Sequence, residues 1–129
     1  MPAGEPPAVL VVEDDPWVRA FIAATLQDEG FRVLEARNGC EAIRVVNEPP
    51  ALPEPPCLVI IDLMLPEMDG LRVLQQLAAP GGRIPVVAMS ASRRHLAAAQ
   101  EAGADALLPK PFDLERLVSI VERYCPPLG

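Results

Sequence analysis

The sequence predicts an α/β fold in which a five-stranded parallel sheet carries helices on both of its faces. Short apolar runs alternate strictly with segments of helical period, and the alternation repeats five times. Strict alternation is typical of right-handed β-α-β units, which build a parallel sheet. Three of the runs are almost uninterrupted aliphatic residues, as in strands covered on both faces. The linear pattern alone does not give the order of the strands in the sheet.

Each predicted strand is one apolar run, and each predicted helix has an apolar stripe. The first helix repeats apolar residues at i, i+3, i+4, i+7 and i+8. The fourth helix, 93–102, has only Leu96 and alanines on its inner face, so we expect it to be the least firmly anchored. The strands are 8–12, 32–36, 57–61, 85–89 and 105–108. The stripes are Val18, Phe21, Ile22, Thr25 and Leu26; Ala42, Ile43 and Val46; Leu71, Leu74, Leu77 and Ala78; and Leu114, Leu117, Val118 and Val121.

Length and charge restrict the class of protein. The chain has 129 residues, enough for one domain. A formal net charge of −7 argues against a nucleic-acid partner, because no basic stripe is present to neutralise phosphates. The apolar runs are far shorter than the roughly 20 residues that cross a bilayer, and the first residues lack a signal-peptide core. We therefore expect a cytoplasmic protein with no membrane contact.

The cysteines and the single histidine form no recognisable motif. Cys40, Cys57 and Cys125 are odd in number and lack CxxC spacing. In a cytoplasmic chain this favours reduced, structural thiols over a disulfide or a zinc site. His95 stands alone, and a metal cluster needs further ligands.

Chemically active side chains follow four of the five apolar runs. Because the carboxyl ends of parallel strands meet at one edge of the sheet, we expect these side chains to converge there. Lys110 is the only lysine, and a mobile ammonium suits a small phosphoryl group better than a planar guanidinium does. The side chains are Glu13, Asp14 and Asp15 after the first run, Asp62 after the third, Ser90 after the fourth and Lys110 after the fifth.

Several carboxylates in one place repel one another unless a cation lies among them or one is protonated. Oxygen ligands without histidine or thiolate favour Mg²⁺. Carboxylates, a hydroxyl and an ammonium around Mg²⁺ suit the oxygens of a phosphoryl group. Asp62 then becomes a nucleophile that forms an aspartyl phosphate.

Four motifs stand at these strand ends: VVEDDP at 11–16, DLMLPEMDG at 62–70, MSA at 89–91 and PKPF at 109–112. On these motifs the chain resembles the receiver domains of bacterial two-component response regulators. The resemblance covers 8–125, leaving 1–7 as a flexible leader and 126–129 as a C-terminal tail. It implies a flavodoxin-like (βα)5 fold with strand order 2-1-3-4-5.

The resemblance also implies roles around the metal. Asp62 would accept a phosphoryl group from the phosphohistidine of a histidine kinase or a histidine phosphotransfer protein. Asp14 and Asp62 would bind Mg²⁺ directly, Glu13 would help through water, and the backbone carbonyl of Met64 would complete the protein ligands. Asp15 has no assigned ligand role.

Further roles concern the phosphate and the switch. Ser90 and Lys110 would hold the phosphate oxygens, and the Lys110–Pro111 peptide would be cis. Receivers commonly carry an aromatic switch residue three before the lysine, and here that position is Leu107. We expect Leu107 to stay largely buried and the movement to fall on the segment 92–103, with a partner surface that includes Arg93 and Arg94. A second copy of the chain, in a dimer that forms on phosphorylation, is a further expected partner. The sequence does not indicate the downstream target.

Some acidic residues have simpler explanations. Asp69 and Asp113 each precede a helical stripe, as helix N-caps do. Pro16 suits a first helical turn. Trp17 is expected to be half-buried beside the site.

Two other functions fit parts of the pattern. An aspartate-nucleophile phosphohydrolase would have a second aspartate two residues after Asp62, where this chain has Met64, and it would carry a cap insertion. A receiver-like interaction module would work without phosphorylation and would not need the acids, which are all present. Neither GxGxxG nor GxxxxGK[ST] occurs. We therefore expect a signalling domain that is not an enzyme.

Overall fold

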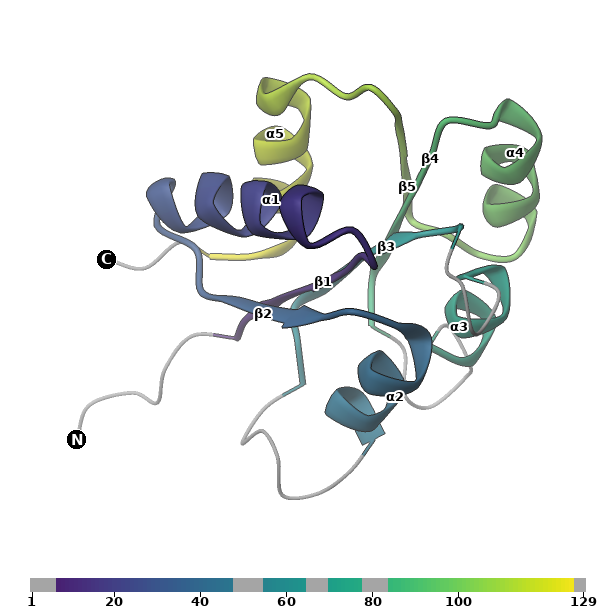
Figure 1. Cartoon of the computed structure of the whole chain (residues 1–129), viewed down its shortest axis with the longest axis horizontal. Coiled ribbons are helices and arrows are strands. Elements are labelled where there is room, and N and C mark those ends of the chain that lie inside the picture. The colour runs from purple at the N-terminus through teal and green to yellow at the C-terminus, as the bar shows by residue number, and fades with distance from the viewer. Residues whose placement is uncertain (1–6, 48–54, 65–69, 78–83, 127–129) are drawn as a thin grey trace.

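The computed structural model describes residues 7–47, 55–64, 70–77 and 84–126. Within these residues, strands and helices alternate five times, as predicted (Figure 1). The strands are β1 (Val9–Val12), β2 (Val33–Ala36), β3 (Leu58–Asp62), β4 (Val86–Ser90) and β5 (Ala106–Pro109). The helices are α1 (Pro16–Asp28), α2 (Gly39–Asn47), α3 (Gly70–Leu77), α4 (Arg93–Glu101) and α5 (Leu114–Tyr124).

All four strand pairs are parallel, and the sheet order is β2-β1-β3-β4-β5. This confirms the predicted fold and the strand order that the resemblance implies. Alternate residues of each strand face opposite layers, since successive side chains point to opposite faces. Helices α1 and α5 pack on one face and α2, α3 and α4 on the other, and each layer has its own apolar cluster (Figure 1).

The register aligns the carboxyl ends of the central strands. Val12 pairs with Ile61, so the residues that follow them, Glu13 and Asp62, lie at the same level. Asp62 in turn pairs with Met89, which places Ser90 one residue further along β4. The sheet therefore brings residues from distant parts of the sequence to one edge.

The apolar stripe of α1 is narrower than predicted. Ile22 and Leu26 are buried against the sheet, whereas Phe21 is 54% exposed. Trp17, expected to be half-buried, is 84% exposed, so that prediction is wrong. The stripe centres on Ile22 and Leu26, and a residue one position away is rotated by about 100° around the helix.

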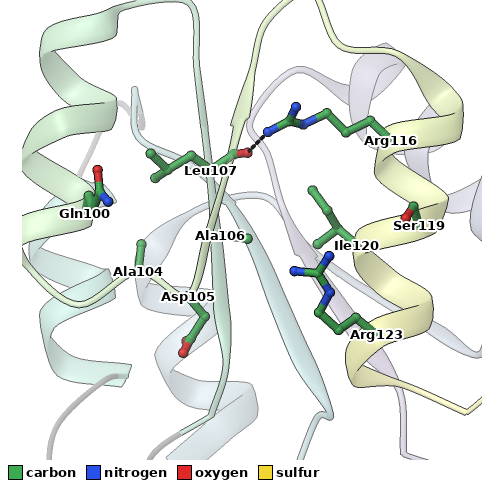
Figure 2. Close-up of a pocket in the computed structure, with 9 residues that line it drawn as sticks. All are labelled: Gln100, Ala104, Asp105, Ala106, Leu107, Arg116, Ser119, Ile120 and Arg123. Atoms are coloured by element: carbon green, nitrogen blue, oxygen red, sulfur yellow. Dashed lines mark hydrogen bonds between the residues drawn. The ribbon is translucent and has the colours of Figure 1, made fainter.

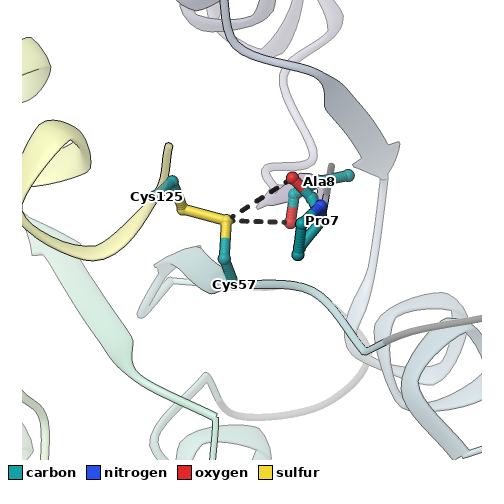
Figure 3. Close-up of a disulfide and its surroundings, with 4 residues drawn as sticks. All are labelled: Pro7, Ala8, Cys57 and Cys125. Carbon is teal, nitrogen blue, oxygen red and sulfur yellow. Dashed lines mark hydrogen bonds between the residues drawn. A yellow bond between two sulfur atoms is a disulfide. The ribbon is translucent and has the colours of Figure 1, made fainter. Parts of the chain in front are cut away.

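The prediction of reduced thiols is also wrong for two of the three cysteines. Cys57 and Cys125 form a disulfide, with Cα atoms 5.6 Å apart (Figure 3). Cys57 precedes β3 and Cys125 follows α5, so both lie at the amino-terminal edge of the sheet. The third cysteine, Cys40, is exposed and free. None of the helices in the described residues is long and apolar enough to cross a membrane.

Candidate functional site

Asp62 lies at the centre of the candidate site. It is the last residue of β3, and its side chain is only 8% exposed. Its Oδ1 accepts a hydrogen bond of 2.9 Å from the backbone N–H of Met64, and its Oδ2 accepts one of 2.9 Å from Lys110 Nζ. These two donors fix the plane of the carboxylate.

Lys110 joins two carboxylates. Its Nζ donates to Glu13 Oε1 at 2.9 Å as well as to Asp62 Oδ2. Glu13 is buried, and its other oxygen accepts from the N–H of Asp15 at 3.3 Å. An ammonium has three donors, so Lys110 retains one beyond these two carboxylates.

Burial and the shared ammonium together determine the protonation of Glu13 and Asp62. Burial raises the pKa of Glu13 from its usual 4.5 to about 7, and the Asp62 carboxylate adds to the rise while Lys110 opposes it. Burial acts in the same direction on Asp62, but the hydrogen bonds from Met64, Lys110 and Glu13 outweigh it and lower the pKa of Asp62. Burial alone would lower the pKa of Lys110, and its contacts with Glu13 and Asp62 raise it instead. Asp62 is therefore the ionised carboxylate near neutral pH, whereas the Glu13 carboxyl group takes up a proton as the pH falls below about 7.

The acids fit a divalent cation. Glu13, Asp14 and Asp62 each offer a carboxylate oxygen, and these oxygens lie within 4.8 Å of one another. Asp14 is exposed and can turn toward a hydrated ion, whereas Glu13 is buried and bonded to Lys110. An all-oxygen set that leaves room for water is what Mg²⁺ requires. The donor chemistry therefore matches the predicted ligands Asp14 and Asp62, with Glu13 behind them.

Ser90 and Lys110 come from adjacent strand ends. Ser90 is buried at the end of β4, and its carbonyl accepts from the N–H of Lys110 at 2.9 Å. The Ser90 Oγ accepts from the N–H of Ser92 at 3.0 Å, which leaves its own O–H available as a donor. The Lys110–Pro111 peptide is cis.

The Ser90 hydroxyl is connected to the start of α4. Ser92, which donates to it, is the N-cap of α4, and the Ser92 side chain accepts from the N–H of His95 at 3.3 Å. Leu96 and Ala99 are the buried residues of α4, as predicted for its small inner face. A displacement of the Ser90 hydroxyl would therefore reach the first turn of α4 through one residue.

Leu107, the predicted switch residue, is half-buried, whereas it was expected to be largely buried. It lies on β5 between α4 and α5, beside a groove of about 530 Å³ (Figure 2). Its side chain points toward α4, and its carbonyl accepts from Arg116 of α5 at 3.4 Å (Figure 2). The side chain stays accessible because β5 is one of the two edge strands of the sheet.

One of the two predicted helix caps lies in the described residues and has the expected geometry. Asp113 is the N-cap of α5, and Pro16 begins α1. Asp15 is the N-cap of α1 and accepts from the N–H of Trp17 at 2.9 Å, which accounts for the third acid of the run. The predicted cap Asp69 lies outside the described residues.

Arg19 and Gly70 hold the backbone around the site in place, although the sequence alone predicts no role for either residue. Arg19 of α1 donates to the carbonyl of Glu13 at 2.8 Å and to the Glu35 carboxylate at 3.3 Å, so it ties the acidic loop to β2. A Cβ on Gly70 would lie 2.6 Å from the carbonyl oxygen of Asp62 and 2.5 Å from Leu63 Cα, so only glycine fits there. Arg19 has no sequence signal beyond its place one turn into the first helix.

A strand-end acid pair bridged by a lysine, on a parallel sheet of order 2-1-3-4-5, defines a receiver-type α/β domain. The response regulator receiver domain family model matches residues 9–122, so the chain belongs to this family. Among its relatives, response regulator MprA of Mycobacterium sp. (strain KMS) is 38% identical over 118 residues, which cover 88% of this chain and 48% of that protein. The MprA of Mycobacterium ulcerans (strain Agy99) is 36% identical over 113 residues, covering 86% of this chain and 47% of that protein. The chain thus spans about half the length of these relatives.

Solved structures agree with this assignment. The receiver domain of the Francisella response regulator 1452 superposes with a TM-score of 0.81 at 29% identity, covering 92% of this chain and 95% of that one. The receiver domain of NtrX from Brucella abortus gives a TM-score of 0.79 at 30% identity, covering 90% and 96%.

Proposed function

We propose that this receiver domain accepts a phosphoryl group on Asp62 from the phosphohistidine of a histidine kinase or a histidine phosphotransfer protein. The observation that carries the proposal is the environment of Asp62: a buried carboxylate that is ionised near neutral pH, is oriented by Met64 and contacts Lys110. Ionisation makes the oxygen a nucleophile, and fixed donors keep it in one orientation.

In the proposed transfer, an oxygen of Asp62 attacks phosphorus and the P–N bond to the donor imidazole breaks. The imidazole nitrogen retains the electron pair and takes up a proton as it leaves. The third donor of Lys110 and the O–H of Ser90 bind phosphoryl oxygens, on which negative charge develops. Bound Mg²⁺, held by Asp14, Asp62 and the Met64 carbonyl, with Glu13 acting through water, would neutralise that charge.

The output of the domain is proposed to pass through α4. Phosphoryl oxygens that attract the Ser90 hydroxyl weaken its bond with the N–H of Ser92, the N-cap of α4. Arg93 and Arg94 are exposed in the first turn of α4, so its displacement changes a charged surface. We propose that this surface contacts a downstream protein or a second, phosphorylated copy.

The domain is proposed to act as a cytoplasmic signalling unit rather than an enzyme with its own substrate. It spans 8–125, with 1–7 and 126–129 outside it. Neither nucleic acid nor a membrane is a proposed partner. In this role the domain assists only its own phosphorylation and dephosphorylation.

Incubation with acetyl phosphate and Mg²⁺, followed by mass spectrometry of the intact protein, tests the proposal. We expect one acid-stable, base-labile phosphate on the wild type, none on Asp62→Asn, and severe loss on Asp14→Ala. Asp15→Asn is the matched control, because it removes the adjacent charge but keeps an N-cap. A stoichiometric phosphate on Asp62→Asn would contradict the assignment. Continuous release of inorganic phosphate without a labelled protein would favour a phosphohydrolase, and no reaction at all would favour an interaction module.

A further inference from the structure

The disulfide between Cys57 and Cys125 lies away from the acidic site. Cys57 directly precedes β3 and Asp62 ends it, so the length of the strand, roughly 16 Å, separates them. Cys125 follows α5 and donates its N–H to the carbonyl of Val121 at 2.9 Å. The disulfide therefore fastens the end of α5 to the start of β3 (Figure 3).

The surroundings of the two sulfur atoms suit both the disulfide and the dithiol. Cys57 Sγ lies 3.5 Å from the carbonyl oxygen of Ala8 and 3.7 Å from that of Pro7 (Figure 3). A disulfide sulfur has no hydrogen to donate, whereas a thiol at this position has an acceptor already in place. Cys125 is 4% exposed in the apolar cluster beneath α1 and α5, where a reduced cysteine packs as a small apolar residue.

Exposure differs between the two cysteines in a way that suits reversible chemistry. Cys57 is half-buried, whereas Cys125 is buried. Oxidants and reductants reach the more exposed sulfur first. Persistent disulfides are rare in the cytosol, where those that occur are usually redox-sensing or catalytic.

From this arrangement we propose that Cys57 and Cys125 are a redox-responsive pair, a modification site that takes a two-electron oxidant of the hydroperoxide class. The Cys57 thiolate attacks a peroxide oxygen, the O–O bond breaks, and Cys57 becomes a sulfenic acid. The Cys125 sulfur then displaces the hydroxyl group and forms the S–S bond. With hydrogen peroxide, two thiols lose two electrons and two protons, and one peroxide becomes two waters. Two thiols of the glutathione type reverse the bond by exchange and leave as their own disulfide.

The modification acts on α5 rather than on the phosphoryl chemistry. The bond closes a sequence separation of 68 residues and restricts the unfolded chain strongly. Oxidation therefore stabilises the fold and restrains the end of α5, while the hydrogen bonds of Asp62 stay the same. The inference rests on the proposed cytoplasmic location but not on the proposed phosphorylation, because its primary readouts are thiol reactivity and stability.

The experiment uses the full chain with Cys40→Ser, which removes the free thiol. The folded protein is treated with hydrogen peroxide or with a millimolar excess of reduced glutathione, and maleimide then counts the free thiols in denaturant, because Cys125 is buried in the folded chain. We expect none after peroxide and two after glutathione, in one reversible step. We also expect the reduced protein to keep its circular dichroism spectrum, to melt roughly 10 °C or more below the oxidised form, and to exchange amide hydrogens faster in the last turn of α5.

The matched control is Cys125→Ser in the same background, in which neither treatment should change the melting temperature. The untreated and glutathione-treated wild type repeats the comparison if a variant does not fold. A bond that survives glutathione in the folded protein would identify a permanent structural disulfide and overturn the proposal. Two reactive thiols after peroxide, or loss of the circular dichroism spectrum on reduction, would overturn it as well.

Discussion

The raised pKa of Glu13 makes a quantitative prediction about stability in the absence of metal. Burial holds the Glu13 proton up to a pH of about 7 in the folded state, whereas an ordinary glutamate loses it near 4.5. Between these values the native chain binds more protons than the unfolded chain, so stability falls as the pH rises. Above about pH 7 both states have lost the proton and the loss is complete.

The size of this loss follows from the same values. A rise from 4.5 to about 7, at about 1.4 kcal/mol per pH unit, corresponds to about 3 kcal/mol as an upper bound. Glu13→Gln removes the titration and keeps an oxygen that can accept from Lys110. We therefore expect the stability of the variant, relative to the wild type, to improve by about 2 to 3 kcal/mol between pH 5 and pH 8.

Urea unfolding in the presence of EDTA at pH 5, 6, 7 and 8 measures this difference. Glu122→Gln, an exposed carboxylate on α5, is the control and should follow the wild type. Adding Mg²⁺ should reduce the loss in the wild type at high pH, because a cation favours the ionised acids. If Glu13→Gln and the wild type change in parallel with pH in EDTA, burial does not hold a proton on Glu13 and the reasoning fails.

Two other predictions test the architecture around the site. Gly70→Ala should lower the free energy of unfolding in urea by about 1 to 3 kcal/mol and slow phosphoryl uptake, since the new Cβ collides with the backbone of Asp62 and Leu63. Arg72→Ala, on the exposed side of α3, is the control, and an unchanged stability of Gly70→Ala would contradict the close packing. Phosphorylation should change the hydrogen exchange of backbone amides mainly in 92–103, because few buried side chains hold α4 and Ser92 links this helix to Ser90. Ser90→Ala should lose this response, and changes confined to β5 around Leu107 would instead assign the switch to that strand.

The sequence alone was sufficient for the alternation of elements and for the edge at which the site forms. Polar residues directly after buried runs can be recognised by eye, and parallel strands bring their carboxyl ends together. The order of the strands in the sheet could not be predicted from the alternation, because the alternation does not indicate on which side of a strand the next strand is added. That information came from the family motifs, and the pairing of β1 with both β2 and β3 agrees with it.

The errors share one cause, which is that they depend on tertiary contacts. Phe21 fits an apolar helical stripe, but only the docked helix determines which side of the stripe is covered. Cys57 and Cys125 are 68 residues apart, and their proximity follows from the end of α5 returning to the start of β3. The raised pKa of Glu13 likewise depends on the burial of its side chain, which no local sequence pattern indicates.

Lys110 explains how so many acids coexist at this edge. Its ammonium contacts the Glu13 and Asp62 carboxylates together, and below about pH 7 a proton on Glu13 reduces the remaining repulsion. A divalent cation at the carboxylates would take over that compensation, so its binding should favour loss of the Glu13 proton. Lys110 could then turn its third donor toward a phosphoryl oxygen without first leaving Asp62. A guanidinium would lack this freedom, because its donors are fixed in one plane. The single lysine of an arginine-rich chain therefore stands where a compact, rotatable charge is needed.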